Sequence, residues 1–387
     1  MLRMAVGHSD DVDAADAIAI AVDQCRDQLN GLAPQAGFLV AAFDSFDPSL
    51  VAAVRDAFPG CALMGSTSSA EMSSTSGFLE DSVSLALFAS DDIDITAGLG
   101  LGLDRDVDAA CRAAIAEARS KSDRDPKVCV VFADPGIVEP QRTLDALAAA
   151  LPDGVVVVGG GSAWQGVDSG APSWQFCDER VTSEGVAVLL FSGPVAYSIA
   201  IGTGWRSLGA SGVITRSAPR QIDEIDGRPA VEFLARYLDV TGPAGHFGNP
   251  LAVREVGADQ SYLRAVTGSE ASSGALSVLG SIPVGSTVQL TTATTEDILS
   301  GTRESLAEAT ADFPAGTRPE AALMFSCVVR RMLLGSRAST EVELARTELG
   351  PSVALAGLYC FGEIGPISGS PSSRYLNSTF VTLLLGT

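Results

Sequence analysis

The chain has 387 residues, of which 46% are hydrophobic and 19% are charged. This balance supports a buried core, excludes a wholly disordered chain and leaves room for two or three domains. With 25 basic and 47 acidic residues, the formal net charge is −22. A surface this negative repels phosphate backbones and anionic lipid headgroups, so we expect neither a nucleic-acid partner nor an anionic membrane surface as a partner.

The sequence carries no signal for membrane insertion, secretion or a metal framework. No apolar run reaches the ~18 residues that a membrane span needs. The N-terminus, MLRMAVGHSDD, turns acidic before any signal-like apolar stretch. The seven cysteines are scattered and form no CxxC pair, which is typical of reduced thiols in a cytosolic protein. We expect a cytoplasmic protein without membrane insertion, metal or other cofactor.

Taken in chain order, the predicted elements repeat three times. Each unit opens with a β-like run and an amphipathic helix, in residues 4–29, 95–120 and 287–311. An apolar run ending near a Phe comes next, in 38–46, 128–136 and 322–330, followed by a short helix in 47–58, 139–151 and 339–349. A second apolar run enters a Gly/Ser-rich turn, in 62–72, 155–166 and 353–365, and a third closes the unit, in 82–90, 185–193 and 378–386.

Each unit therefore has the predicted order β-α-β-α-β-β. Its continuous apolar strands are typical of sheets that are buried on both faces, and its helices carry apolar residues at helical spacing. We predict an α/β fold with two related halves built from these repeated units, in which mostly buried sheets are covered by helices. Chance similarity between apolar runs is the alternative to duplication.

An insertion-like stretch, roughly residues 195–285, separates the second and third units. It contains a strand-like run, a helical segment over 228–238 and a loop-like piece, TGPAGHFGNP, over 241–250. The best boundary between the halves falls near 205–218. We predict an N-terminal domain over residues 1–205 and a C-terminal domain over residues 206–387.

Several familiar chemistries are disfavoured by the residues present. His8 and His246 are the two histidines, and their wide separation argues against a clustered-His zinc site and against a Ser-His-Asp triad. No P-loop or dinucleotide-binding fingerprint occurs. The turn GGGS over 159–162 follows a four-Val strand, so its N–H groups and Ser162 could receive an anion at a helix start. A tight turn is the preferred interpretation.

Polar residues interrupt the apolar pattern in the last predicted unit, directly after two buried strands. Cys327 and Arg330 follow the first strand, and Tyr359, Cys360 and Glu363 follow the second. Ligands commonly bind at the carboxyl ends of strands in α/β sheets. Because Arg grips a carboxylate bidentately and Glu accepts from an ammonium, Arg330 and Glu363 would suit a zwitterion. The alternative is that these two side chains pair with each other or cap helices.

A turn glycine and a second carboxylate extend this candidate site. Gly362 precedes Glu363 and would let the backbone turn sharply to aim that side chain. Glu71 follows the equivalent Gly/Ser turn of the first unit. Cys327 could be a nucleophile if Arg330 lowers its pKa. Because neither His lies in the motif to act as its base, a buried apolar thiol is the preferred interpretation.

These motifs resemble those of the FIST domain family, from about residue 15 to the end of the chain. SCVVRRMLLG over 326–335 is similar to a pattern S-C-x-x-R followed by LLG. GLYCFGEIGP over 357–366 is similar to G-F-Y-x-x-G-E-I-G-P, with Leu358 in place of a Phe. MGSTSSAEM over 64–72 is similar to the turn G-C-S-x-A-G-E, with Ser66 in place of the Cys and no Gly before Glu71.

The resemblance implies intracellular sensing of a small ligand, with amino acids proposed as ligands, and output through a separate signalling protein. We therefore predict a cytoplasmic sensory module that captures a small polar metabolite, without catalysis, in a cleft between strand ends. The predicted ligand-binding residues are Arg330, Glu363, Cys327, Tyr359, Glu71, Ser66, Gly362 and Ser162. One alternative is a thiol- or carboxylate-dependent enzyme that uses Cys327 or Cys360 with Glu363. Another is a scaffold that binds only protein.

Overall fold

Three copies of one supersecondary unit make up the body of the protein. The computed structural model describes residues 1–42, 46–163, 173–239, 248–367 and 372–387. The first unit contains β1 (Leu2–Ser9), α1 (Ala14–Leu29), β2 (Ala36–Ala42), α2 (Pro48–Ala57), β3 (Ala62–Ser68), β4 (Ala70–Ser73), β5 (Gly77–Leu79) and β6 (Val83–Ser90). The second contains β7 (Asp94–Leu101), α3 (Val107–Arg119), β8 (Pro126–Ala133), α4 (Pro140–Ala150), β9 (Val156–Gly161), β10 (Gln175–Cys177), β11 (Arg180–Thr182) and β12 (Gly185–Ser192).

The third unit is interrupted by an insertion after its first strand. It contains β13 (Ala196–Gly202), α6 (Thr295–Ala311), β22 (Ala321–Cys327), α7 (Val328–Leu334), α8 (Ser339–Leu349), β23 (Ala354–Cys360), β24 (Glu363–Pro366), β25 (Ser373–Leu376) and β26 (Phe380–Gly386). Several helix starts are fixed by short polar side chains, as N-terminal capping prefers. Asp13 caps α1, and Thr294 forms a capping box with Asp297 at the start of α6.

Each unit builds its sheet in the same strand order. The first strand pairs with the last, the last with the second and the second with the third, which gives β1-β6-β2-β3, β7-β12-β8-β9 and β13-β26-β22-β23. The second and third strands run parallel in every unit. They can do so because the helical connection between them returns the chain to the end of the sheet at which the second strand began. The recurrence of this order confirms the predicted α/β class and the predicted repeat.

A hairpin from each unit completes the sheet of a neighbouring unit. The hairpin β4–β5 of the first unit pairs with β23 of the third. The hairpin β10–β11 of the second unit pairs with β3 of the first, and β24–β25 of the third unit pairs with β9 of the second. The exchange forms a closed cycle and makes three six-stranded sheets. No unit could therefore form its complete sheet alone.

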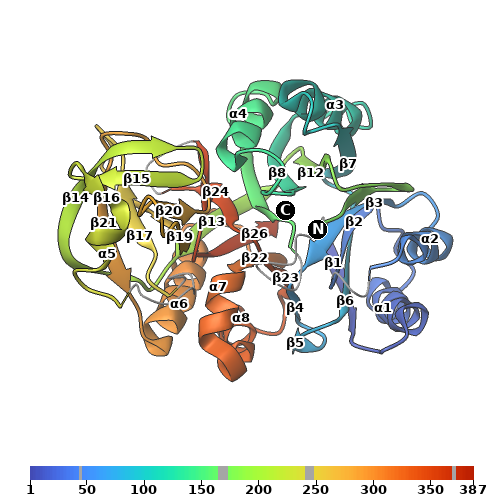
Figure 1. Cartoon of the computed structure of the whole chain (residues 1–387). Coiled ribbons are helices and arrows are strands. Elements are labelled where there is room, and N and C mark those ends of the chain that lie inside the picture. Colours follow the sequence, from blue (N-terminus) through green and yellow to red (C-terminus); the bar gives the residue numbers. More distant parts are fainter. Residues whose placement is uncertain (43–45, 164–172, 240–247, 368–371) are drawn as a thin grey trace.

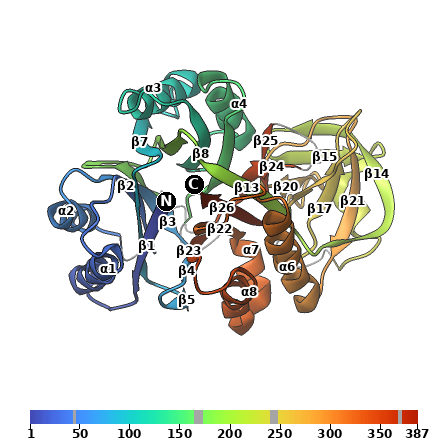
Figure 2. The same ribbon diagram turned by 180° about the vertical axis from the view of Figure 1, so that it is seen from behind.

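The three sheets turn one face toward a common core, which we call the axial face. Phe38, Phe132 and Phe325, from the three second strands, meet there with ring centroids 6.3 and 6.2 Å apart. Helices cover the outer faces: α1 and α2 on the first sheet, α3 and α4 on the second, and α6 with α8 on the third. Figures 1 and 2 show these helix layers surrounding the sheets, with both chain ends near the centre. Among the described residues, no helix is long and apolar enough to cross a membrane.

A ring of backbone hydrogen bonds joins the three sheets where the third strands end. The N–H of Ser69 donates to the carbonyl of Tyr359 at 3.0 Å, and the N–H of Ala163 donates to the carbonyl of Thr67 at 3.0 Å. The N–H of Phe361 donates to the carbonyl of Gly161, also at 3.0 Å. Each bond links equivalent positions of successive units. The units are therefore related by an approximate threefold axis at this end of the core.

The insertion lies between β13 and α6 and forms an eight-stranded sheet of its own. Its elements are β14 (Arg206–Ala218), β15 (Gln221–Ile225), β16 (Arg228–Pro229), α5 (Ala230–Leu234), β17 (Leu251–Arg254), β18 (Tyr262–Arg264), β19 (Val266–Ser269), β20 (Leu276–Val278) and β21 (Thr287–Thr292). It contacts the second unit through Arg220, which donates to the carbonyls of Pro135 and Val138. The N–H of Ser281 donates to Glu139 at 3.0 Å.

One strand assignment from the sequence was wrong. Residues 287–292 were expected to open the third unit, but they form β21 and pair inside the insertion with β14 and β17. The opening strand of the third unit is β13, which pairs with β26 along its full length. Both segments are β-rich, and the sequence alone did not show which of them continues the third sheet. The loop-like piece over 241–250 lies largely outside the described residues.

Candidate functional site

The predicted site residues lie on opposite faces of the third sheet. Tyr359 belongs to the outer, helix-covered face, and Arg330 contacts residues of α6 and α8 there. Glu71 pairs with Leu358, whose side chain is in the axial core, so Glu71 is on the axial face. Glu363 is on the axial face of the second sheet for the same reason, because it pairs with Gly160. The structure thus separates the residues that were expected to surround one ligand.

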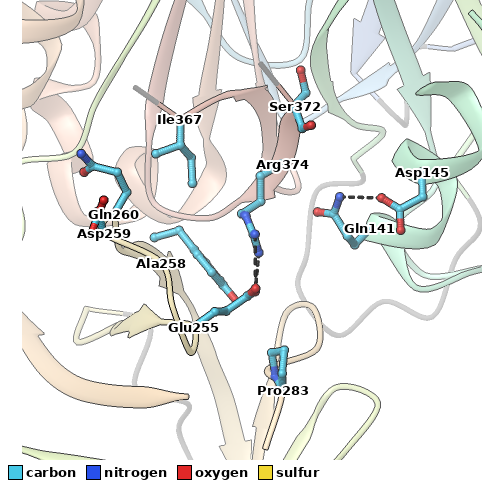
Figure 3. A pocket seen from close by; sticks show the side chains of 12 residues that line it. Gln141, Asp145, Glu255, Ala258, Asp259, Gln260, Pro283, Ile367, Ser372 and Arg374 are labelled. Carbon is cyan, nitrogen blue, oxygen red and sulfur yellow. Dashed lines mark hydrogen bonds and ion pairs between the residues drawn. The ribbon is translucent and has the colours of Figure 1, made fainter. Parts of the chain in front are cut away.

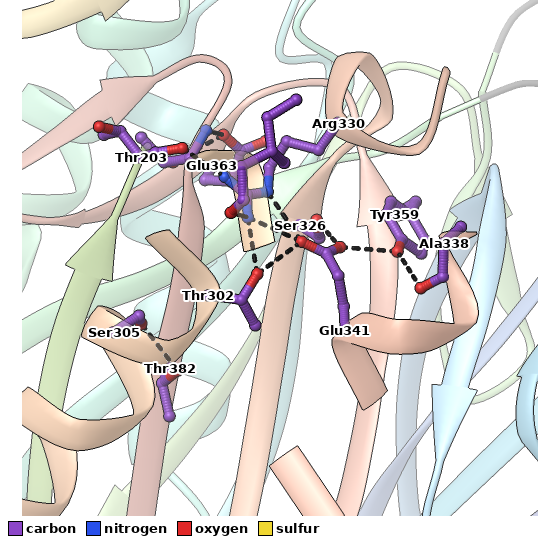
Figure 4. A network of polar contacts seen from close by, with 12 residues as sticks. Thr203, Thr302, Ser305, Ser326, Arg330, Ala338, Glu341, Tyr359, Glu363 and Thr382 are labelled. Atoms are coloured by element: carbon purple, nitrogen blue, oxygen red, sulfur yellow. Dashed lines mark hydrogen bonds and ion pairs between the residues drawn. The ribbon is translucent and has the colours of Figure 1, made fainter. Parts of the chain in front are cut away.

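Arg330 and Glu341 form a fully buried ion pair on the outer face (Figure 4). The Nε and Nη2 atoms of Arg330 donate to Glu341 Oε1 at 3.0 and 2.7 Å. Its Nη1 donates to the carbonyl of Thr203 at 2.7 Å, and its Nη2 also donates to that of Ile298 at 2.8 Å. Because all three nitrogens donate within the protein, the prediction that Arg330 holds a ligand carboxylate opposite Glu363 does not fit the structure.

Glu341 collects the remaining polar groups of this outer cluster. It accepts hydrogen bonds from Thr302 and Ser326 at 2.8 Å and from the hydroxyl of Tyr359 at 2.6 Å. Buried polar groups are stable when they are paired in this way. The cluster ties α6, α7, α8, β22 and β23 together, and Tyr359 therefore serves packing of the third unit. The sequence analysis missed Glu341, because nothing in the sequence distinguishes it from the other acidic residues of the same predicted helix.

Glu363 sits in a second polar cluster on the axial side. Its Oε2 accepts from the N–H and the hydroxyl of Thr379 at 3.0 and 2.7 Å, and the Cys360 thiol contacts its Oε1 at 3.7 Å. Burial raises the pKa of Glu363 to about 8, although these hydrogen bonds favour the charged form. Burial also raises the pKa of both Cys327 and Cys360 well above the usual value. Both groups are therefore thiols, not thiolates, at neutral pH.

Glu71 occupies a similar cluster between the third and first sheets. The hydroxyls of Ser68 and Ser82 donate to its two carboxylate oxygens, and burial raises the pKa of Glu71 to about 7. His8 contacts Ser82 through Nε2 at 2.9 Å and Ser73 through Nδ1 at 2.8 Å. Burial lowers the pKa of His8 to about 4, so this ring is neutral at physiological pH. Ser66 lies nearby in β3 and donates to the carbonyl of Thr67.

The strand registers show that Glu71, Gln175 and Glu363 are equivalent under the approximate threefold axis. They pair with Leu358, Ser66 and Gly160, which occupy the same position in the three third strands. The two carboxylates have their hydrogen-bond partners, whereas Gln175 Oε1 has none among the residues that the structure describes. The sequence analysis missed Gln175 because the spacing after the turn differs between the units. Glu71 follows Ser68 by three residues, whereas Gln175 follows the equivalent residue, Ser162, by thirteen.

The equivalent third cluster is incomplete for a specific reason. Ser82 and Thr379 supply hydroxyls to Glu71 and Glu363, but the matching position of the second unit is Gly185. Ser162, which matches Ser68, is fully buried, and its hydroxyl has no hydrogen-bond partner within the described part of the chain. Asp134 instead accepts from Ser173 at 2.8 Å, which joins the end of β8 in the second sheet to the start of the hairpin β10–β11 in the first sheet. Gly362 has a φ of 80° and lies against the Tyr375 ring, so it serves the turn into β24.

A cavity of about 660 Å³ lies elsewhere, where the insertion meets the second unit and β25. We call it the junction cavity; its polar lining includes Gln141, Asp145, Glu255, Asp259, Tyr262 and Arg374. None of the eight predicted ligand-binding residues lines it. Figure 3 shows Arg374 reaching from β25 to Glu255, with Asp145 on one side and Asp259 on the other. This volume is in the range of sites for small molecules.

An ion pair forms the centre of the junction cavity. Arg374 Nη1 and Nη2 lie 2.5 and 3.4 Å from the two carboxylate oxygens of Glu255. Tyr262 holds both partners: its hydroxyl donates to Glu255 at 2.9 Å, and the Arg374 guanidinium lies 4.5 Å from its ring centroid. These hydrogen bonds lower the pKa of Glu255 although burial opposes them. This site could not be predicted from the sequence, because its residues come from four separate segments without a motif.

Comparison with known proteins places the chain in a family. The FIST N domain model matches residues 35–228, and the FIST C domain model matches residues 230–366. The chain belongs to the FIST family. Two uncharacterized proteins, from Mycobacterium bovis and Mycobacterium tuberculosis, are each 25% identical to this FIST protein over 380 residues, which is 95% of both chains.

Two solved structures are distantly similar to this FIST protein. A cyanuric acid hydrolase from A. caulinodans matches with a TM-score of 0.36 and 10% identity, over 100% of this chain and 99% of that one. A second cyanuric acid hydrolase structure matches with a TM-score of 0.29 and 11% identity, over 52% of this chain and 72% of that one.

The FIST family motifs now have places in the structure. Two residues of the S-C-x-x-R motif, Ser326 and Arg330, belong to the outer cluster around Glu341. The third, Cys327, lies on the axial side beside Glu363. Of the second motif, Tyr359 joins the outer cluster and Glu363 the axial one. Both motifs thus brace the third unit from its two faces.

Proposed function

We propose that this FIST protein is a sensory module that binds a small polar ligand in the junction cavity. The observation that carries the proposal is a cavity of about 660 Å³ with a prearranged, half-buried ion pair, Arg374–Glu255, inside it. A guanidinium and a carboxylate at fixed positions can bind a ligand carboxylate and a ligand ammonium. Family membership supports a sensory role, and an amino acid fits both charges. Four of the ligand contacts predicted from the sequence lie on the axial side, and they could reach a ligand only in a conformation in which the axial core opens. These residues are Ser66, Glu71, Cys327 and Glu363.

The position of the cavity favours signalling by movement of the insertion. Its walls come from α4 of the second unit, from β25 of the third unit and from the segment between β17 and β18 of the insertion. A ligand that contacts all three would change the relative stability of closed and open arrangements of the insertion. A cytoplasmic partner protein that reads the insertion surface would receive the signal.

The proposal includes no catalytic step. Cys327 and Cys360 are fully buried, and their raised pKa keeps them protonated, which removes the thiolate that nucleophilic catalysis needs. Their carboxylate neighbour Glu363 is itself neutral over most of the physiological pH range, because its pKa is about 8. These observations favour binding over the thiol-dependent enzyme.

A thermal-shift screen tests the proposal. The purified full chain is titrated with a panel of the twenty protein amino acids and related small amines and acids. We expect at least one member to raise the melting temperature in a saturable manner, as binding to the folded state requires. Arg374→Gln should abolish the shift, whereas Arg228→Gln, which removes an exposed pair with Glu232, should retain it. A shift that survives in Arg374→Gln would place binding elsewhere and contradict the proposal.

A further inference from the structure

The charges that line the junction cavity are not balanced. Asp145, Glu255 and Asp259 contribute three carboxylates, and Arg374 contributes one guanidinium. Arg374 is paired with Glu255. Asp145 accepts a hydrogen bond from the amide of Gln141 at 3.1 Å, but this partner is neutral. The neighbouring cation on α4, Arg142, pairs with Asp108 instead. Asp145 and Asp259 therefore have no ion-pair partner among the described residues, although Arg142 attracts Asp145 at longer range.

The net charge at the centre of this cavity differs from the net charge at its flanks. The guanidinium of Arg264 lies 4.4 Å from the Tyr262 ring centroid, close to that of Arg374 at 4.5 Å. Arg264 is fully buried and donates to the carbonyls of Leu263 and Tyr375, and its Nε has no partner in the described segments. Two guanidinium groups and the Glu255 carboxylate therefore meet around Tyr262, which leaves a net positive charge there. Asp145 and Asp259 stand on either side of Arg374, on α4 and on the segment after β17 (Figure 3).

This separation selects the charge pattern of a ligand. A carboxylate is favoured at the Tyr262 end, where two guanidinium groups lie close together. An ammonium group is favoured beside Glu255. A further cationic group is favoured toward Asp145 or Asp259, because each otherwise lacks a charged partner in the lining. The formal net charge of −22 on the whole chain adds attraction for a cation.

We propose that the junction cavity selects a dibasic amino acid, a small molecule with one carboxylate and two cationic groups. This inference rests on the proposed function and adds the ligand class to it. L-Lysine is the probe, compared with L-norleucine, which lacks the terminal ammonium, and with cadaverine, which lacks the carboxylate. L-Glutamate adds a probe of opposite charge. Their dissociation constants are measured by isothermal titration calorimetry on the full chain at low salt.

We expect L-lysine to bind about three- to tenfold more tightly than L-norleucine and cadaverine, the range expected for one partly exposed ion pair. The double variant D145N/D259N should bring the ratio between L-lysine and L-norleucine close to one. The matched control E343Q/E348Q removes two exposed charges from α8, so it changes the net charge equally. It should leave the ratio unchanged, which separates local contacts from the general field.

The outcomes distinguish this inference from the proposed function. If L-norleucine or L-glutamate binds as tightly as L-lysine and the binding is lost in Arg374→Gln, the ligand class is wrong while the binding function stands. Equal binding of cadaverine overturns the requirement for a carboxylate. An unchanged ratio in D145N/D259N overturns the contribution of the two aspartates. If none of the probes and no member of the amino-acid panel binds, both the inference and the proposed function fail.

Discussion

Replacing Glu363 by Gln should remove a large part of the pH dependence of stability. Glu363 is fully buried, and burial raises its pKa from 4.5 to about 8 in the folded protein. The folded state therefore holds a proton on this side chain that the unfolded state releases between pH 4.5 and 8. Since the folded state binds more protons over this range, stability falls as the pH rises through it. Gln keeps the shape and the acceptor oxygen for Thr379 but cannot ionise.

The size of the change in stability follows from the shift in the pKa of Glu363. A difference of about 3.5 pKa units corresponds to ~5 kcal/mol in total, of which about 3 kcal/mol is lost between pH 5 and pH 8. Other groups around Glu363 do not titrate in this range. Burial holds the pKa of Cys327, Cys360 and Tyr375 well above their usual values. The difference between variant and parent thus isolates Glu363, because Glu71 titrates equally in both.

Urea unfolding at pH 5, 6, 7 and 8 measures this difference. We expect Glu363→Gln to be about 3 kcal/mol less sensitive to the change from pH 5 to pH 8 than the parent, with the same dependence on urea. Glu343→Gln, on the exposed face of α8, serves as the control and should follow the parent at every pH. Parallel curves for parent and Glu363→Gln would refute the reasoning, because Glu363 would then be ionised already in the folded protein.

Three further predictions concern the buried groups. Arg330→Leu should lower the free energy of unfolding by about 3–5 kcal/mol in urea titrations, because Glu341 is left as an uncompensated buried charge; adding Glu341→Gln should recover part of that loss. Gly362→Ala should be more destabilising than Gly31→Ala in thermal unfolding: both positions have positive φ, but only at Gly362 would the new methyl lie 2.2 Å from the Tyr375 ring. All seven cysteines are buried, so a thiol reagent should label none of them in the native protein and all of them after unfolding; rapid native labelling would contradict this.

The repeat could be predicted from the sequence because burial on both faces of a sheet leaves a local mark. Each second and third strand packs against the axial core on one side and helices on the other, so most of its residues are apolar or small. The helices between them carry their own apolar stripe and a polar cap, as α1 does with Asp13. These signals depend on neighbouring residues in the chain. They are therefore readable without knowing the partner of any strand.

The hairpin exchange could not be predicted, because it depends on contacts between distant segments. Residues 70–73 (β4) follow β3 directly, yet they pair with β23, almost three hundred residues later. The same difficulty affected Arg330. Its position after a neighbouring strand suggested a site shared with Glu363. Arg330 instead contacts α6 and α8 on the outer face of the third sheet, whereas Glu363 lies on the axial face of the second sheet. Its true partner, Glu341, lies one helix away and carried no distinguishing pattern.

The approximate threefold axis gives a physical reason for treating the axial carboxylates as structural elements rather than as a binding site. Glu71 joins a strand of the third sheet to hydroxyls of the first, and Glu363 joins a strand of the second sheet to Thr379 beside the third. Both side chains thus act at equivalent seams between sheets. Gln175, at the remaining seam, lacks the hydroxyl partner because Gly185 replaces it, and Asp134 with Ser173 closes that seam instead. A ligand that needed these carboxylates would have to break two of the three seams, whereas the junction cavity can be filled without disturbing any of them.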